Sequence, residues 1–145
     1  MFTRSILVSA GLLALAMASS AAYAQSTDDN RLDDAWKAAL EDQEGILTPQ
    51  QNAALNNIAY QAAVARVCSG FEIDSAKYAK AVNDIIVPGS DKRSDKENLE
   101  RQAGILVSLG TVYGLFLAEG TAKKDDFCAN ASEFKDNKEM THLWQ

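Results

Sequence analysis

Apolar residues recur at helical spacing along most of the chain, and no stretch alternates apolar and polar residues long enough to predict a strand. Leu32, Trp36 and Leu40 are four residues apart, which predicts an amphipathic helix that ends at Gly45. The polar residues 25–30 before it are expected to be frayed. The next helix carries its apolar positions along one face, at Leu55, Ile58, Ala62 and Ala65.

The beginning and end of this second helix are marked by capping residues. Thr48 fits the N-cap, Pro49 the first helical position and Gln51 the third, which together predict a capping box. Gly70 can adopt the left-handed conformation that commonly follows a helix end, so the helix is expected to stop just before it.

Two further helices are predicted from similar signals. Asp74 is expected to cap a third helix, which Pro88-Gly89 ends. Ser94 and Glu97 form a second predicted capping box, which opens the longest helix, about residues 95–119, with Gly120 as its end.

Residues 102–118, within this longest helix, contain no charged side chain. A membrane helix is one interpretation, with Gly110-x-x-x-Gly114 as a packing motif, but 17 residues are at the lower limit for crossing a bilayer. The interpretation we favour is the central helix of a soluble bundle, covered on all sides, whose glycines let neighbouring helices approach.

A fifth helix is predicted over residues 123–136, with Phe127, Ala131 and Phe134 on one face. The fold class expected is therefore all-α: a small bundle of four or five helices with one disulfide, after a cleaved signal peptide. The residues after the fifth helix include Met140, Leu143 and Trp144, and the pattern leaves open whether they dock on the bundle.

The first 24 residues have the three parts of a secretory signal peptide. Arg4 gives a positive start, residues 6–18 form an apolar run, and Ala22-Tyr23-Ala24 is a small-x-small cleavage box. We therefore predict a signal peptide over 1–24 and one helical domain over 25–145, located in the periplasm or secreted.

Two cysteines in an exported chain predict one disulfide, Cys68–Cys128, although free or intermolecular thiols are the alternative. Closing a loop of about 60 residues would stabilise the fold by ~4 kcal/mol in the chain-entropy model. The bridge would tether the end of the second helix to the fifth helix.

The chain is acidic, with a formal net charge of −6, and loss of Arg4 with the signal peptide lowers this charge by one further unit. Such a surface repels nucleic acid and anionic membranes, so neither is expected as a partner. No membrane span is expected in the mature form.

No residue pattern points to catalysis, a cofactor or a metal, so an enzyme is not expected. His142 is the only histidine and cannot build a histidine-based metal site alone. The acidic residues 28–34 and Asp125-Asp126 lie near helix beginnings, where the helix dipole explains them, and they lack the glycine turn of a calcium loop.

Aromatic residues dominate binding hot spots, so Trp36, Tyr60 and Trp144 are the residues proposed for a binding surface. A rigid bridged scaffold without an active-site pattern favours protein binding, as in an inhibitor or immunity-type protein. The partner expected is another protein, with a basic one favoured by electrostatic steering, and a homodimer is also compatible.

In architecture alone, the expected protein is similar to two groups of exported helical proteins: periplasmic immunity proteins and acid-activated periplasmic chaperones of the HdeA type. The second group gives an alternative function, a stress chaperone that loosens when its carboxylates are protonated. A carrier that holds a small apolar ligand between its helices is the third hypothesis.

Overall fold

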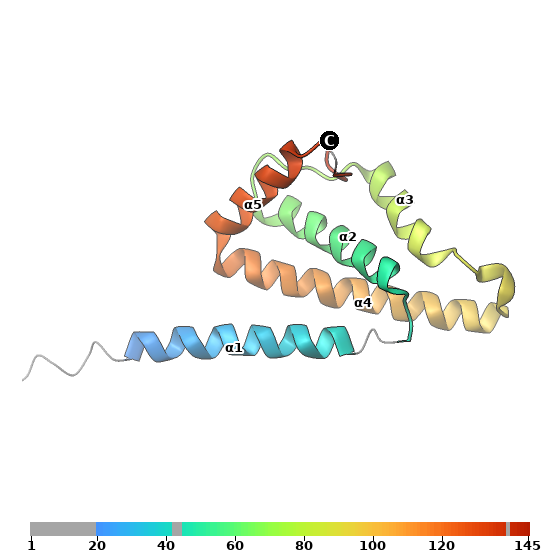
Figure 1. Cartoon of the computed structure of the whole chain (residues 1–145), viewed down its shortest axis with the longest axis horizontal. Helices are drawn as coiled ribbons and strands as arrows, with labels where there is room; N and C mark the ends of the chain where they lie inside the picture. The colour runs from blue at the N-terminus through green and yellow to red at the C-terminus, as the bar shows by residue number, and fades with distance from the viewer. Residues whose placement is uncertain (1–19, 42–44, 139) are drawn as a thin grey trace, which may run out of the picture. The chain divides into compact units, whose positions relative to one another are not determined.

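The computed structural model describes the backbone of residues 20–41, 45–138 and 140–145, and side chains from residue 31 onward within those ranges (Figure 1). The chain divides into two compact units, Met1–Arg31 and Leu32–Gln145, and the second contains the helical core. The described elements are α1 (Ser20–Glu41), α2 (Pro49–Val67), α3 (Ser75–Ile86), the short 3₁₀ turn η1 (Ser90–Lys92), α4 (Asp95–Ala122) and α5 (Lys124–Asp136).

The described residues contain five α-helices and no strand, which confirms the predicted all-α class. One isolated antiparallel bridge joins Ile73 to Trp144. The predicted signal peptide lies mostly outside the described residues. Residues 25–30 were expected to be frayed, but α1 continues through them without a break.

Capping residues set the helix beginnings as the sequence predicts. The Thr48 hydroxyl accepts the Gln51 N–H at 3.3 Å, and the Gln51 side chain accepts the Thr48 N–H at 3.0 Å. Ser94 and Glu97 form the same reciprocal pair at the beginning of α4. The Asp74 carboxylate accepts two backbone N–H groups at the beginning of α3. These bonds satisfy donors that a helix cannot satisfy within itself.

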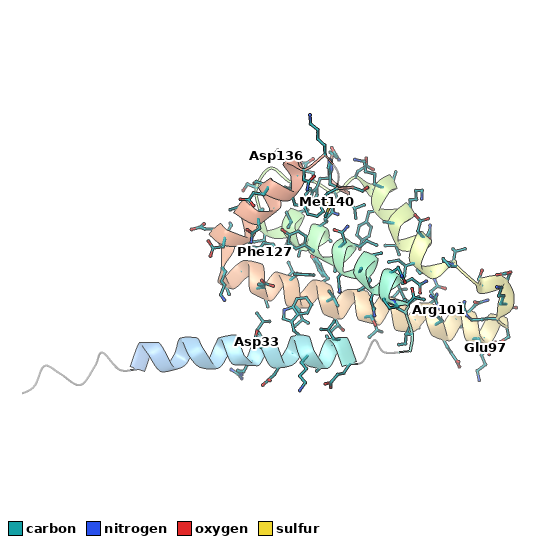
Figure 2. All side chains as sticks on the ribbon, viewed as in Figure 1. Asp33, Glu97, Arg101, Phe127, Asp136 and Met140 are labelled. Atoms are coloured by element: carbon teal, nitrogen blue, oxygen red, sulfur yellow. A yellow bond between two sulfur atoms is a disulfide. The ribbon has the colours of Figure 1, made fainter. Side chains whose placement is uncertain are left out.

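The predicted end of α4 at Gly120 is wrong, because the helix continues to Ala122. Gly120 is buried, and a Cβ placed on it would lie 2.8 Å from the Phe127 ring. Glycine is therefore needed at this position so that α5 can pack closely against α4, rather than to end the helix (Figure 2 shows Phe127 on α5).

The core of the Leu32–Gln145 unit lies between α2 and α4, which have the most extensive contact in the chain. Figure 1 shows α2 running alongside α4, with α5 near one end of α2 and α3 near the other. One buried cluster joins Leu55 and Ile58 of α2 to Ile105 and Val112 of α4. A second cluster joins Val64 of α2 to residues of α5 and the C-terminal tail, including Phe127, Ala131 and Trp144.

The end of α3 is held by a side chain from α4. No basic residue lies in the last turn of α3. The Arg101 guanidinium instead donates to the carbonyl oxygens of Ile86 at 2.9 Å and Ile85 at 3.4 Å (Figure 2). Desolvation, together with the nearby positive charge of Arg93, lowers the pKa of Arg101 from its usual value. Arg101 thus supplies the positive charge that favours a helix C-terminus.

The predicted disulfide Cys68–Cys128 is present, with the two Cα atoms 5.6 Å apart. Cys68 is the C-cap of α2, and Cys128 lies in the second turn of α5. The bridge therefore joins the end of α2 to α5, as expected, across a sequence separation of 60 residues.

Candidate binding surfaces

The side of α4 that faces away from the core is apolar and exposed. We call it the α4 outer face and define it by seven exposed residues: Leu99, Ala103, Leu106, Val107, Gly110, Gly114 and Ala118. The exposed fraction is 68% for Leu99, 47% for Leu106 and 69% for Val107. Steps of three and four residues place all seven on one side of a helix.

This face corrects the expectation that residues 102–118 are covered on all sides. Ile105 and Val112 are almost completely buried against α2, whereas the opposite side of the same helix is open. A Cβ placed on Gly104 would lie 3.6 Å from the Ile46 side chain. A Cβ on Gly110 or Gly114 would meet nothing within 4 Å, so no neighbouring helix requires glycine there.

By length and composition, α4 also qualifies as a helix that could cross a membrane. One such helix is weak support for a span, because the core helix of a soluble protein meets the same criteria. Its buried side packs against α2, and its second turn holds Arg101, whose guanidinium binds the end of α3.

Trp144 is fully buried, so the prediction that it contributes to an exposed binding surface is corrected. Its indole N–H donates to the Gln61 carbonyl oxygen at 3.0 Å, and its ring packs edge-on against Phe71 and Phe134. Its backbone carbonyl accepts the Lys77 ammonium at 2.9 Å. The residue is therefore an internal anchor for the C-terminal tail.

Gln61 is the residue that receives this tail, and it is completely buried in α2. Its side-chain oxygen accepts the Leu143 N–H, and its amide nitrogen donates to Asn57 at 2.9 Å and to the Thr141 carbonyl oxygen at 3.4 Å. The sequence analysis missed Gln61, because an isolated glutamine on a helix carries no sign of a partner 82 residues away.

Trp36 and Tyr60, the other two aromatic residues proposed for a surface, are half-buried and meet at Phe116. The Phe116 ring lies 4.8 Å from that of Trp36 and 5.4 Å from that of Tyr60, both edge-on. Burial raises the pKa of Tyr60, and the charge of Glu119 adds to the effect. The structure thus brings Trp36 and Tyr60 together at Phe116, and Tyr60 also packs against the second core cluster, which contains Trp144.

A separate groove of about 320 Å³ lies between α2, α3 and the tail. Its lining is mostly apolar. The apolar lining comes from Ala54, Ile58, Ala81, Ile85 and Leu143, and the polar lining from Gln50, Gln51, Asn57, Asp84 and Thr141. Its volume is at the lower end of the range for small-molecule sites.

The charged and polar residues considered for chemistry lie apart from one another. The His142 ring stacks on Trp144 with its centroid 6.1 Å away, so it is half-buried rather than an exposed tail residue. Within the part of the chain that the structure describes, no three histidine, cysteine or acidic side chains converge as a metal site would require.

Comparison with known proteins does not suggest a function, so a function is proposed from these surfaces alone. No protein-family model, no curated protein and no solved structure matches the chain.

Proposed function

We propose that this is an exported protein that acts by binding another protein through the α4 outer face. The observation that carries the proposal is the exposure of Leu106 and Val107 on one side of a helical stretch without charged residues, with Leu99 also exposed two turns before Leu106. Single exposed apolar residues are common, whereas a row of them along one side of a helix is typical of an interaction site.

The charges around this face favour a partner with a basic surface. The chain is acidic overall, whereas residues 102–118 carry no charge. A partner with an apolar contact patch and a basic surround would be steered by the acidic surface and bound at the neutral strip. An inhibitor or immunity-type role fits this arrangement.

The disulfide supports the exported location. Such bonds persist in oxidising compartments and are rare in the cytosol, which fits the predicted signal peptide over residues 1–24. The periplasm or the extracellular space is therefore the proposed location, and a soluble form without a membrane span is the proposed mature state.

Replacing Val107 with lysine tests the proposal. Val107→Lys is expected to abolish recovery of a stoichiometric partner after cross-linking in the cell envelope, because it places a charge at the centre of the strip. Val87→Lys is the matched control, since Val87 is 57% exposed and lies outside the α4 outer face. Equal recovery of the partner by both variants would contradict the proposal.

The groove between α2, α3 and the tail favours a second function, the carriage of a small apolar ligand. Native mass spectrometry of the freshly purified protein is expected to show a bound molecule, and Ala54→Trp, which fills the groove, is expected to remove it. A single mass equal to that of the bare chain would rule this function out.

The chaperone hypothesis requires apolar surface that becomes available on acidification. The α4 outer face is already exposed in the folded protein, so binding through it needs no such trigger. This favours constitutive protein binding over an acid-activated role.

A further inference from the structure

We infer that the α4 outer face binds a second copy of this chain, with the two α4 helices antiparallel. The inference rests on the proposed function, since it uses the same face, but it names a second acidic copy in place of the basic partner considered above. Large and small residues divide along the face: Leu99, Leu106 and Val107 lie in its first half, and Gly110, Gly114 and Ala118 in its second half.

An antiparallel second copy matches these halves. When the two-fold axis passes between residues 108 and 109, Val107 of one copy is level with Gly110 of the other along the helix axes. In the same register Leu99 is level with Ala118, and Leu106 is level with Thr111. Leu99 and Val107 then lie level with alanine and glycine, and Leu106 with the medium-sized Thr111, whereas a parallel pair aligned in the same register would place large against large. A two-fold contact of this kind is self-complementary.

The glycines support a close approach from outside the chain. Glycine weakens a helix interior relative to alanine, and a Cβ at Gly110 or Gly114 would meet no atom within 4 Å. Packing within the chain therefore gives no reason for these two glycines. Helices whose facing residues are small can approach more closely than others, and a second α4 would use that freedom.

The absence of charge along most of the face permits this occupant. Two acidic copies repel each other over most of their surface, but residues 102–118 bring no charge into the contact. Within the chain, Lys123 at the C-cap of α4 and Lys124 after it already place positive charge at the negative end of the helix dipole.

The size of the face predicts a weak and reversible dimer. Residues 99–118 extend about 30 Å along the helix, and a width of about 10 Å gives a contact footprint of about 300 Å² per copy. Stable interfaces bury about 800 Å² per partner, so a dimer held by this face alone is expected to form only at high protein concentration.

Sedimentation equilibrium of the purified, oxidised protein from about 10 µM to about 1 mM tests the inference. The wild type is expected to dimerise, and Gly110→Val is expected to weaken the dimer about tenfold or more, because two valines then meet. The double variant Val107→Gly/Gly110→Val exchanges the large and small positions and is expected to recover the dimer. Val87→Lys is the control, and circular dichroism checks that each variant is folded.

Three outcomes would overturn the inference: a wild type that stays monomeric up to about 1 mM, a dimer insensitive to Gly110→Val and Val107→Lys, or a monomer that floats with phosphatidylglycerol vesicles. Should Gly110→Val fail to fold, the exposed substitution Val107→Lys gives the same readout. A monomeric wild type whose cross-linked partner is still lost in Val107→Lys would remove the dimer and leave the proposed function standing. A Val107→Lys variant that keeps both the dimer and the cross-linked partner would contradict both the inference and the proposed function.

Discussion

At the scale of single residues, the contact between Gln61 and the C-terminal tail fixes the position of the chain's last segment. A buried glutamine is costly unless its polar atoms are bonded, and both ends of the Gln61 amide have partners. Two of these partners belong to the tail: the Leu143 N–H and the Thr141 carbonyl oxygen. The Gln61 carbonyl also accepts the Trp144 indole N–H, so one residue holds the tail at three points.

Replacing Trp144 with alanine is expected to lower the free energy of unfolding by about 3–5 kcal/mol, because a completely buried aromatic side chain is removed. Met140→Ala in the same tail is the control: its side chain is 44% exposed, and the loss should be within about 0.5 kcal/mol. Denaturant titration followed by circular dichroism measures both. Similar losses for the two variants would mean that the tail does not stabilise the fold.

At the scale of elements, the beginning of α4 is set by local contacts and its later course by contacts with residues distant in sequence. Its beginning is set within four residues by the Ser94–Glu97 capping box. Its later course depends on distant residues, since Gly120 accommodates Phe127 from α5. A glycine near the end of an apolar stretch can therefore mark a close helix contact as well as a helix end.

The capping box makes the beginning of α4 sensitive to acid. Hydrogen bonds from the Ser94 backbone N–H and side chain lower the pKa of Glu97 below its usual value. Because the folded pKa is below the unfolded one, the stabilisation is complete above the unfolded value, about 4.3, and is lost as the pH falls through the folded pKa.

Comparison of the wild type with Glu97→Gln measures this effect, because glutamine keeps an acceptor but cannot titrate. The wild type is expected to have the higher denaturation midpoint at pH 7, and the difference should shrink as the pH falls below about 4. A difference between the two proteins that is independent of pH would contradict the role assigned to the Glu97 charge.

Other features of α4 were not predictable from the sequence, for a physical reason. Caps such as Thr48 and Ser94 are bonded within three residues, so their partners can be identified in the sequence itself. An uncharged stretch such as 102–118 has no polar side that would reveal which surface is covered. The sequence therefore predicted the helix but not the exposure of Val107.

At the scale of the whole molecule, two connections hold the Leu32–Gln145 unit together. The disulfide ties α2 to α5, and the tail bonds to α2 and to the segment before α3. The disulfide could be predicted, because two cysteines in a chain with a predicted signal peptide have few alternatives. The place of Trp144 could not be predicted, since its bonding partner Gln61 is 83 residues away.

Removal of the bridge by the double variant Cys68→Ser/Cys128→Ser is expected to lower the free energy of unfolding by ~4 kcal/mol, because the unfolded chain regains the freedom of a 60-residue loop. Guanidinium titration of this variant beside the oxidised wild type measures the loss. The dependence on denaturant should also steepen, since the unbridged chain exposes more surface. An unchanged midpoint would show that packing alone fixes α5 against α2.

The docking of Leu143 and Trp144 has a consequence for the order in which the fold can be completed. A ribosome makes the chain from the N-terminus, so α2 and α3 are finished long before Trp144 exists. Until then Gln61 lacks the partners it has in the folded protein, and the second core cluster lacks its largest side chain. A chain still being made thus has an incomplete core until residues 141–144 have been added, which is compatible with the export proposed above.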